Sequence, residues 1–232
     1  MWLMNASGGI RGGMTNALLA LWRSTVGRKA LVAVSGLLLW VWIVAHLLGN
    51  LTLFSGPMAA DAYSAALHRA PAWLWAARAG LALAAVVHVA GVVSLTRLDR
   101  RARPHHQARG SLRASTTASR GMRIGGALLL AFVVYHLLHL TFGVLHPGFR
   151  PGRVHDNVVG GLSPAWVAGV YVAAAALLGA HLFHGLWAAA RSLGTRPEAA
   201  GALRRPVVAV LSAAIAIGFA SVPVAVLAGW LR

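Results

Sequence analysis

The stretch that decides the fold is KALVAVSGLLLWVWIVAHLLGNLTLF, which runs from Lys29 to Phe54. About 20 consecutive apolar residues are enough for a helix to cross a bilayer, and this stretch has no charged residue after Lys29. It nevertheless contains His46. An ionisable side chain inside a membrane span is costly, so His46 indicates a function beyond packing.

The whole chain shares the apolar character of this stretch. Of its 232 residues, 58% are hydrophobic and 11% are charged, which lies outside the composition of ordinary soluble domains. Apolar windows of spanning length recur, whereas the short alternating segments of a membrane β-barrel do not. We therefore expect a single all-α membrane domain over 1–232, a bundle of five transmembrane helices at about 29–54, 73–97, 123–146, 164–190 and 206–230.

The net charge of +17 indicates topology and argues against a nucleic-acid partner. Most of the 21 Lys and Arg residues precede the first span or link spans two and three or spans four and five. Short loops rich in Lys and Arg stay in the cytoplasm. We expect a multi-pass protein of the inner (cytoplasmic) membrane, in contact with lipid, with its N-terminus cytoplasmic and its C-terminus outside. The basic segment 97–123 is either a solvated loop or a docking surface for an acidic soluble partner.

Histidines in four of the spans sort into two depths. At 1.5 Å of rise per residue, His88 and His181 lie about 14–15 Å from the basic ends of their helices. His136 lies about 20 Å and His46 about 26 Å from the same side. Each level thus draws one histidine from each of two helices. Two such pairs are what two six-coordinate haems inside a helical bundle require; the alternative is that each histidine makes an interhelical hydrogen bond.

Two glycines fit the same arrangement. Gly36 and Gly126 each lie ten residues before a histidine of the outer level. Ten helical residues span about 15 Å, which places each glycine at the level of the other pair. A small residue there would let a porphyrin edge pass, or would simply let helices approach. Two more histidines, one turn beyond members of the pairs, are alternative ligands or partners of haem propionates: His139 and His184.

The histidines occur within an ordered set of motifs. These are Ser35-Gly36 ahead of His46-Leu-Leu-Gly-Asn50, His88-Val-Ala-Gly91, Arg123-Ile-Gly-Gly ahead of Tyr135-His136, and His181-Leu-Phe-His184-Gly-Leu-Trp187. The set resembles the cytochrome b membrane anchor of succinate:quinone oxidoreductases, of the single-chain, five-helix type with two haems b. The resemblance covers the first four spans well and the fifth by hydropathy only. It implies that His46 and His136 ligate a distal haem, and that His88 and His181 ligate a proximal haem.

The resemblance also implies partners and an activity. The chain would be a subunit of succinate dehydrogenase or fumarate reductase, with an iron–sulfur subunit and a flavoprotein subunit on the cytoplasmic side. Electrons would pass through both haems to a membrane quinone, with menaquinone favoured over ubiquinone. The chain has no cysteine with which to hold an iron–sulfur cluster of its own. It would carry electron transfer and quinone binding without succinate chemistry or a catalytic residue, and a higher oligomer of the complex is compatible with this role.

A quinone needs protons when it is reduced, so a titratable or hydroxyl group should lie near it. The outer stretch after the first span resembles the corresponding loop of the family and offers four candidates. A second candidate location lies beside the proximal haem. The quinone candidates are Asp61, Tyr63, Ser64 and His68, and the candidates for haem-propionate or pocket contacts are Lys29, Ser35, Gly36, Arg123, Gly126, His139 and His184.

Two other functions compete with this interpretation. One is the b-type cytochrome anchor of another quinone-linked enzyme, such as a hydrogenase or formate dehydrogenase. The other is a transporter or proton channel that uses the histidines as a relay. The respiratory cytochrome b of quinol:cytochrome c reductase carries ligands for two haems on one helix, and no helix predicted here does so.

Overall fold

The structure is a computed structural model that describes residues 16, 19–101, 117–194 and 201–232, leaving aside the side chains of 117–120 and 201–204. Throughout these ranges the regular structure is helical, and no strand occurs. Among the described residues, five helices are long and apolar enough to cross a membrane, which confirms the predicted all-α, multi-pass class. They are α2 (Thr25–Leu51), α4 (Pro71–Arg101), α5 (Thr117–His136), α7 (Ala165–Ser192) and α8 (Gly201–Leu227).

Two connections between the predicted spans, after the first span and between the third and the fourth, contain helices of their own. A short 3-10 turn, η1 (Thr52–Ser55), extends α2 and leads into α3 (Pro57–His68). Gly56 separates them with a φ of 94°, and Pro57 follows at the first helical position, where its missing N–H costs nothing. The second connection contains α6 (Val154–Leu162).

The third span is shorter than predicted. The apolar pattern predicts a helix to residue 146, whereas α5 passes into a π-helical turn, η3 (Leu137–Thr141), and ends there. Gly143 then adopts a left-handed φ of 71°, which a continuing helix cannot contain. The other spans differ from their predicted ranges by a few residues at each end, and α4 continues to Arg101 because polar residues prolong the helix beyond its apolar window.

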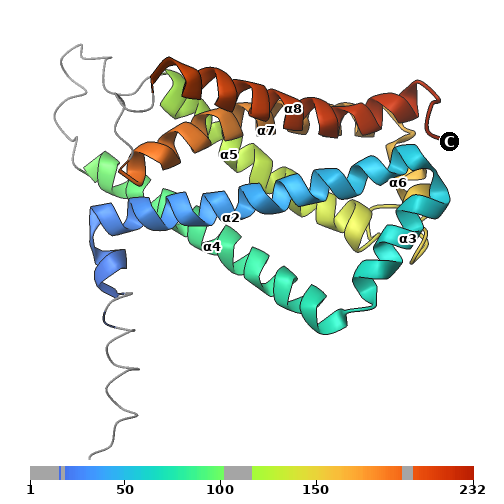
Figure 1. The fold of residues 1–232 in the computed structure, drawn as a ribbon, viewed down its shortest axis with the longest axis horizontal. Coiled ribbons are helices and arrows are strands. Elements are labelled where there is room, and N and C mark those ends of the chain that lie inside the picture. Colours follow the sequence, from blue (N-terminus) through green and yellow to red (C-terminus); the bar gives the residue numbers. More distant parts are fainter. Residues whose placement is uncertain (1–15, 17–18, 102–116, 195–200) are drawn as a thin grey trace, which may run out of the picture.

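The long helices run alternately up and down, so that like ends gather (Figure 1). At one end lie the starts of α2, α5 and α8 and the ends of α4 and α7, together with basic residues such as Arg28, Arg97 and Arg191. We call this the basic end. The opposite end carries α3, α6 and the C-terminus, and we call it the α3–α6 end.

Packing in the bundle centres on α2 and α7. Helix α2 contacts α4, α7 and α8, the pair α7 and α8 makes the most extensive contact, and α5 packs chiefly on α7. A buried apolar cluster at the α3–α6 end includes Leu53, Leu162 and Ala225, which join η1, α6 and α8. Helix α8 carries no histidine, and its Pro223 is buried against this packing, in agreement with a packing role.

Candidate functional site

The outer-level histidines face each other. His46 of α2 and His136 of α5 have ring centroids 5.8 Å apart, and their ring planes meet at 70°. Phe219 of α8 lies 5.7 Å from the His46 ring, and Tyr171 of α7 lies 5.9 Å from the His136 ring. The pair is therefore held between aromatic side chains of the two helices that pack most closely together.

The inner-level histidines form a second pair of the same shape. His88 of α4 and His181 of α7 have ring centroids 6.4 Å apart, with ring planes at 67°. The structure thus brings together the same two pairs that were grouped by depth in the sequence, each with one imidazole from each of two helices.

These spacings suit two imidazoles on opposite sides of one metal ion. A metal–imidazole nitrogen bond is about 2.0 Å and that nitrogen lies about 1.1 Å from its ring centre, so two imidazoles that held one metal ion from opposite sides would have centroids about 6.2 Å apart. The observed distances of 5.8 and 6.4 Å lie on either side of this value. A direct imidazole–imidazole hydrogen bond does not account for them, since none joins either pair in the described part of the chain.

The helices that carry each pair do not pack extensively on each other. Over the described residues, α2 packs on α4, α7 and α8 and α5 packs on α7, whereas neither α2 with α5 nor α4 with α7 forms a substantial interface. The imidazoles therefore meet across a separation between backbones. A flat macrocycle between them would fill such a separation, which a helix-packing histidine would not require.

His88 is oriented in the way expected of a metal ligand. Its Nδ1–H donates to the Val32 carbonyl at 3.2 Å, and the Ser35 hydroxyl oxygen lies 3.4 Å from the same nitrogen. Binding of one ring nitrogen to a carbonyl fixes the tautomer and leaves the other nitrogen for a metal. At the outer level, the Nδ1 of His136 lies 3.5 Å from the Tyr171 hydroxyl, and the Nε2 of His46 lies 3.3 Å from the Asn50 amide nitrogen.

The inner pair is also bordered by the two glycines singled out in the sequence. A Cβ atom at Gly36 would lie 3.1 Å from Cε1 of His88, and one at Gly126 would lie 3.5 Å from Cε1 of His181. Both glycines belong to the helices that carry the outer histidines. The Nδ1 of His181 is buried and has no hydrogen-bond partner in the described chain. Buried polar atoms are usually hydrogen-bonded, so a bound group could supply the missing partner.

The other predicted pocket residues lie in varied surroundings. Lys29 is exposed at the basic end, where Arg123 lies 3.9 Å from the Asp99 carboxylate. His184 donates from Nδ1 to the Ala180 carbonyl of its own helix at 2.9 Å. His139 is buried, and its Nδ1 lies 2.9 Å from the Tyr171 hydroxyl.

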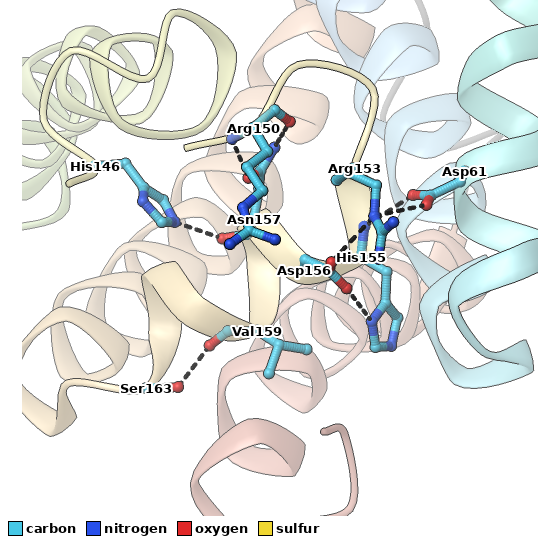
Figure 2. Close-up of polar contacts among 9 residues, drawn as sticks. All are labelled: Asp61, His146, Arg150, Arg153, His155, Asp156, Asn157, Val159 and Ser163. Carbon is cyan, nitrogen blue, oxygen red and sulfur yellow. Dashed lines mark hydrogen bonds and ion pairs between the residues drawn. The ribbon is translucent and has the colours of Figure 1, made fainter. Parts of the chain in front are cut away.

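The four quinone candidates all lie on α3. Asp61 accepts a hydrogen bond from the His155 backbone N–H at 3.1 Å and so joins α3 to α6 (Figure 2). Tyr63 lies against α2 at Gly49, and His68 donates from Nδ1 to the carbonyl of Ser64 at 2.8 Å. Asp61 and Tyr63 therefore attach α3 to α6 and α2, and the His68 ring is bonded within α3 itself.

A cavity of about 670 Å³ opens where α5, η3, α6 and α7 meet, and none of the four candidates on α3 lines it. Sequence reasoning missed most of its lining, although Tyr171, which supports it, lies ten residues before His181. The same offset drew attention to the glycines and could have marked Tyr171 as a neighbour of the outer pair. The lining includes Tyr135, His139, His146, Arg150, Asp156, Gly161, Trp166 and Val167.

No protein-family model matches the chain, and neither a curated protein nor a solved structure is found to match it. Within the described ranges, no group of three or more His, Cys, Asp or Glu residues could hold a metal ion unaided. A haem differs in this respect, because the porphyrin supplies the equatorial nitrogens and the protein supplies only axial ligands. The two imidazole pairs are therefore the groups of this chain that could hold haem.

Proposed function

We propose that the chain is the two-haem cytochrome b anchor of a succinate:quinone oxidoreductase. The observation that carries this proposal is the presence of two imidazole pairs at different depths in one membrane bundle, with centroid separations of 5.8 and 6.4 Å. A single histidine in a membrane helix is explained by a hydrogen bond. Two facing pairs, each from helices that are not otherwise packed together, are better explained by two ligated macrocycles.

Four residues would hold the two haems b. His46 and His136 would ligate the distal group, and His88 and His181 the proximal one. When bound, haem supplies one-electron chemistry, and two imidazole ligands per iron favour electron transfer over oxygen binding. The carbonyl of Val32 fixes the His88 ring, and Gly36 and Gly126 leave room beside the inner imidazoles.

The soluble partners would dock at the basic end. Its described basic residues include Arg23, Lys29, Arg97, Arg100 and Arg205, and such a surface attracts an acidic partner. By the positive-inside rule this end faces the cytoplasm. An iron–sulfur subunit with its flavoprotein would deliver electrons there, and a membrane quinone, with menaquinone favoured, would receive them.

A reduced-minus-oxidised visible spectrum of the purified chain tests the proposal directly. We expect two b-type haems per chain. His88→Ala and His181→Ala should remove the same spectral component, and His46→Ala and His136→Ala the other. His184→Ala is the control, since its ring is bonded to its own helix and both components should remain. A chain without haem would refute the proposal.

Co-purification distinguishes the remaining b-type possibility. A succinate-oxidising flavoprotein should accompany the chain from native membranes. Recovery with a hydrogenase or formate dehydrogenase instead would assign the chain to another quinone-linked enzyme. A colourless protein whose histidine variants lose ion or proton flux would make it a relay transporter.

A further inference from the structure

The cavity at the α3–α6 end has the character of a binding site for a flat, partly apolar molecule. Its volume of about 670 Å³ falls within the usual range for small-molecule sites. Apolar groups such as Leu145 and Val167 line it beside the polar side chains of His139 and Arg150. Trp166, which also lines it, is 70% exposed, as expected of a tryptophan at a membrane interface.

His146 fixes one wall of the cavity, and both of its ring nitrogens are already hydrogen-bonded within the protein. His146 donates from Nε2 to the Asn157 carbonyl at 2.9 Å and accepts at Nδ1 from the Gly148 N–H at 3.1 Å. Asn157 also accepts from the Arg150 backbone N–H and donates to its carbonyl (Figure 2). These bonds hold the loop after η3 against α6 and shape the wall.

His139 is a polar group of the wall that still has hydrogen-bonding capacity for a ligand. Its ring is stacked with that of Tyr135 and with that of His146, with centroids 5.3 Å away in each case. Its Nδ1 meets the Tyr171 hydroxyl at 2.9 Å, while its Nε2 has no hydrogen-bond partner within the described residues. If the Tyr171 hydroxyl donates to Nδ1, then Nε2 carries the proton and can donate to an acceptor in the cavity.

The same hydroxyl connects the cavity to the outer imidazole pair. The Tyr171 oxygen lies 3.5 Å from Nδ1 of His136, so it can accept from that nitrogen while it donates to His139. Only the Tyr171 hydroxyl thus separates a molecule beside His139 from His136, a predicted haem ligand. A membrane-soluble electron acceptor would need to bind close to that ligand.

We propose that this cavity holds the ring of the membrane quinone, with Nε2–H of His139 donating to one of its two carbonyl oxygens. The inference rests on the proposed function and moves the quinone site from α3 to the junction of α5, α6 and α7. The apolar lining and the exposed Trp166 suit a ligand that enters from lipid. The stacked rings of Tyr135 and His139 suit its flat shape.

Photolabelling of the full chain in native membranes with an azido-naphthoquinone tests the site without a measurement of turnover. We expect the label in peptides covering 135–148 or 160–167, with protection by unmodified naphthoquinone. Labelling confined to 57–68 or to 28–36, or no labelling at all, would overturn the proposal.

Two phenylalanine variants sharpen the test. His139→Phe keeps an aromatic ring but loses the donor, so half-maximal labelling should need about tenfold more probe, the effect of one hydrogen bond. His184→Phe is the matched control and should label as the unaltered chain does. Should His139→Phe fail to accumulate, Tyr171→Phe removes the orienting hydroxyl and should also weaken labelling. Equal effects of the His139 and His184 substitutions would contradict the assignment.

The haem spectrum of each preparation separates the two proposals. Two haems with a label outside the cavity would refute the quinone site and leave the anchor function standing. A label inside the cavity of a chain without haem would refute the anchor function and retain the site.

Discussion

Replacement of Gly91 by alanine would perturb the inner histidine pair through helix packing. A Cβ atom at Gly91 of α4 would lie 2.5 Å from Cγ2 of Val32 on α2. Carbon atoms in contact prefer about 3.5–4.0 Å, so the two groups must separate by about 1 Å or more. Val32 resists rotation because β-branched side chains in helices favour one χ1 rotamer. The Val32 carbonyl also accepts the hydrogen bond from His88, so a displacement of Val32 would shift the His88 ring of the inner pair.

The magnitude follows from a comparison with Gly80 on the same helix, where an added Cβ would meet nothing within 4 Å. The helix-propensity gain of alanine is common to both substitutions and cancels. Overpacking costs about 1–3 kcal/mol, and at about 2–4 °C per kcal/mol for a chain of this size, Gly91→Ala should melt about 2–12 °C below Gly80→Ala.

Thermal unfolding in a mild detergent measures this difference. The double variant Val32→Ala/Gly91→Ala should melt no lower than Val32→Ala alone, because removal of Cγ2 removes the clash. Equal melting temperatures for Gly91→Ala and Gly80→Ala would refute the reasoning, and so would a double variant that loses the sum of both single effects.

Two further predictions concern the inner pair and the cavity wall. Gly36→Ala should lower the haem-to-protein ratio more than Gly126→Ala. The methyl group at position 36 would lie 3.1 Å from Cε1 of His88, whereas the methyl group at position 126 would make an ordinary 3.5 Å contact with Cε1 of His181. Equal haem-to-protein ratios of the two variants would contradict this. Asn157→Ala should cost about 1–3 kcal/mol of stability and should speed proteolysis between residues 142 and 153. Ser163→Ala, which loses only a bond to its own helix, is the control and should leave cleavage unchanged. Unchanged cleavage of Asn157→Ala would show that other contacts hold the loop.

The sequence was sufficient to predict the five spans because membrane helices are long and uniformly apolar. Depth along a straight helix follows from residue count, and the two pairs grouped by depth are the ones whose rings lie 5.8 and 6.4 Å apart. The sequence did not predict α3 and α6, because short helices at a bundle end depend on tertiary contacts such as the one from Asp61 to the His155 N–H.

The cavity was missed for a related reason. It depends on where the third span stops, and the π-helical turn after His136 could not be read from hydropathy. That turn, with Gly143, reverses the chain and allows His146 to lie beside His139. Seven residues separate the two in the sequence, and in an unbroken helix they would have been two turns apart rather than stacked.

The position of α5 at the margin of the bundle has a consequence for assembly. Its principal neighbour among the long helices is α7, and on its other side it meets α2 mainly through the outer imidazoles. The α5–α7 interface is smaller than those of α2 with α4, α2 with α7 and α7 with α8, so α5 has the weakest packing of the long helices in the described ranges. In the proposed two-haem protein, ligation by His46 and His136 would give α5 a second connection to the bundle, so supply of the pigment would limit how quickly a finished subunit accumulates in the membrane.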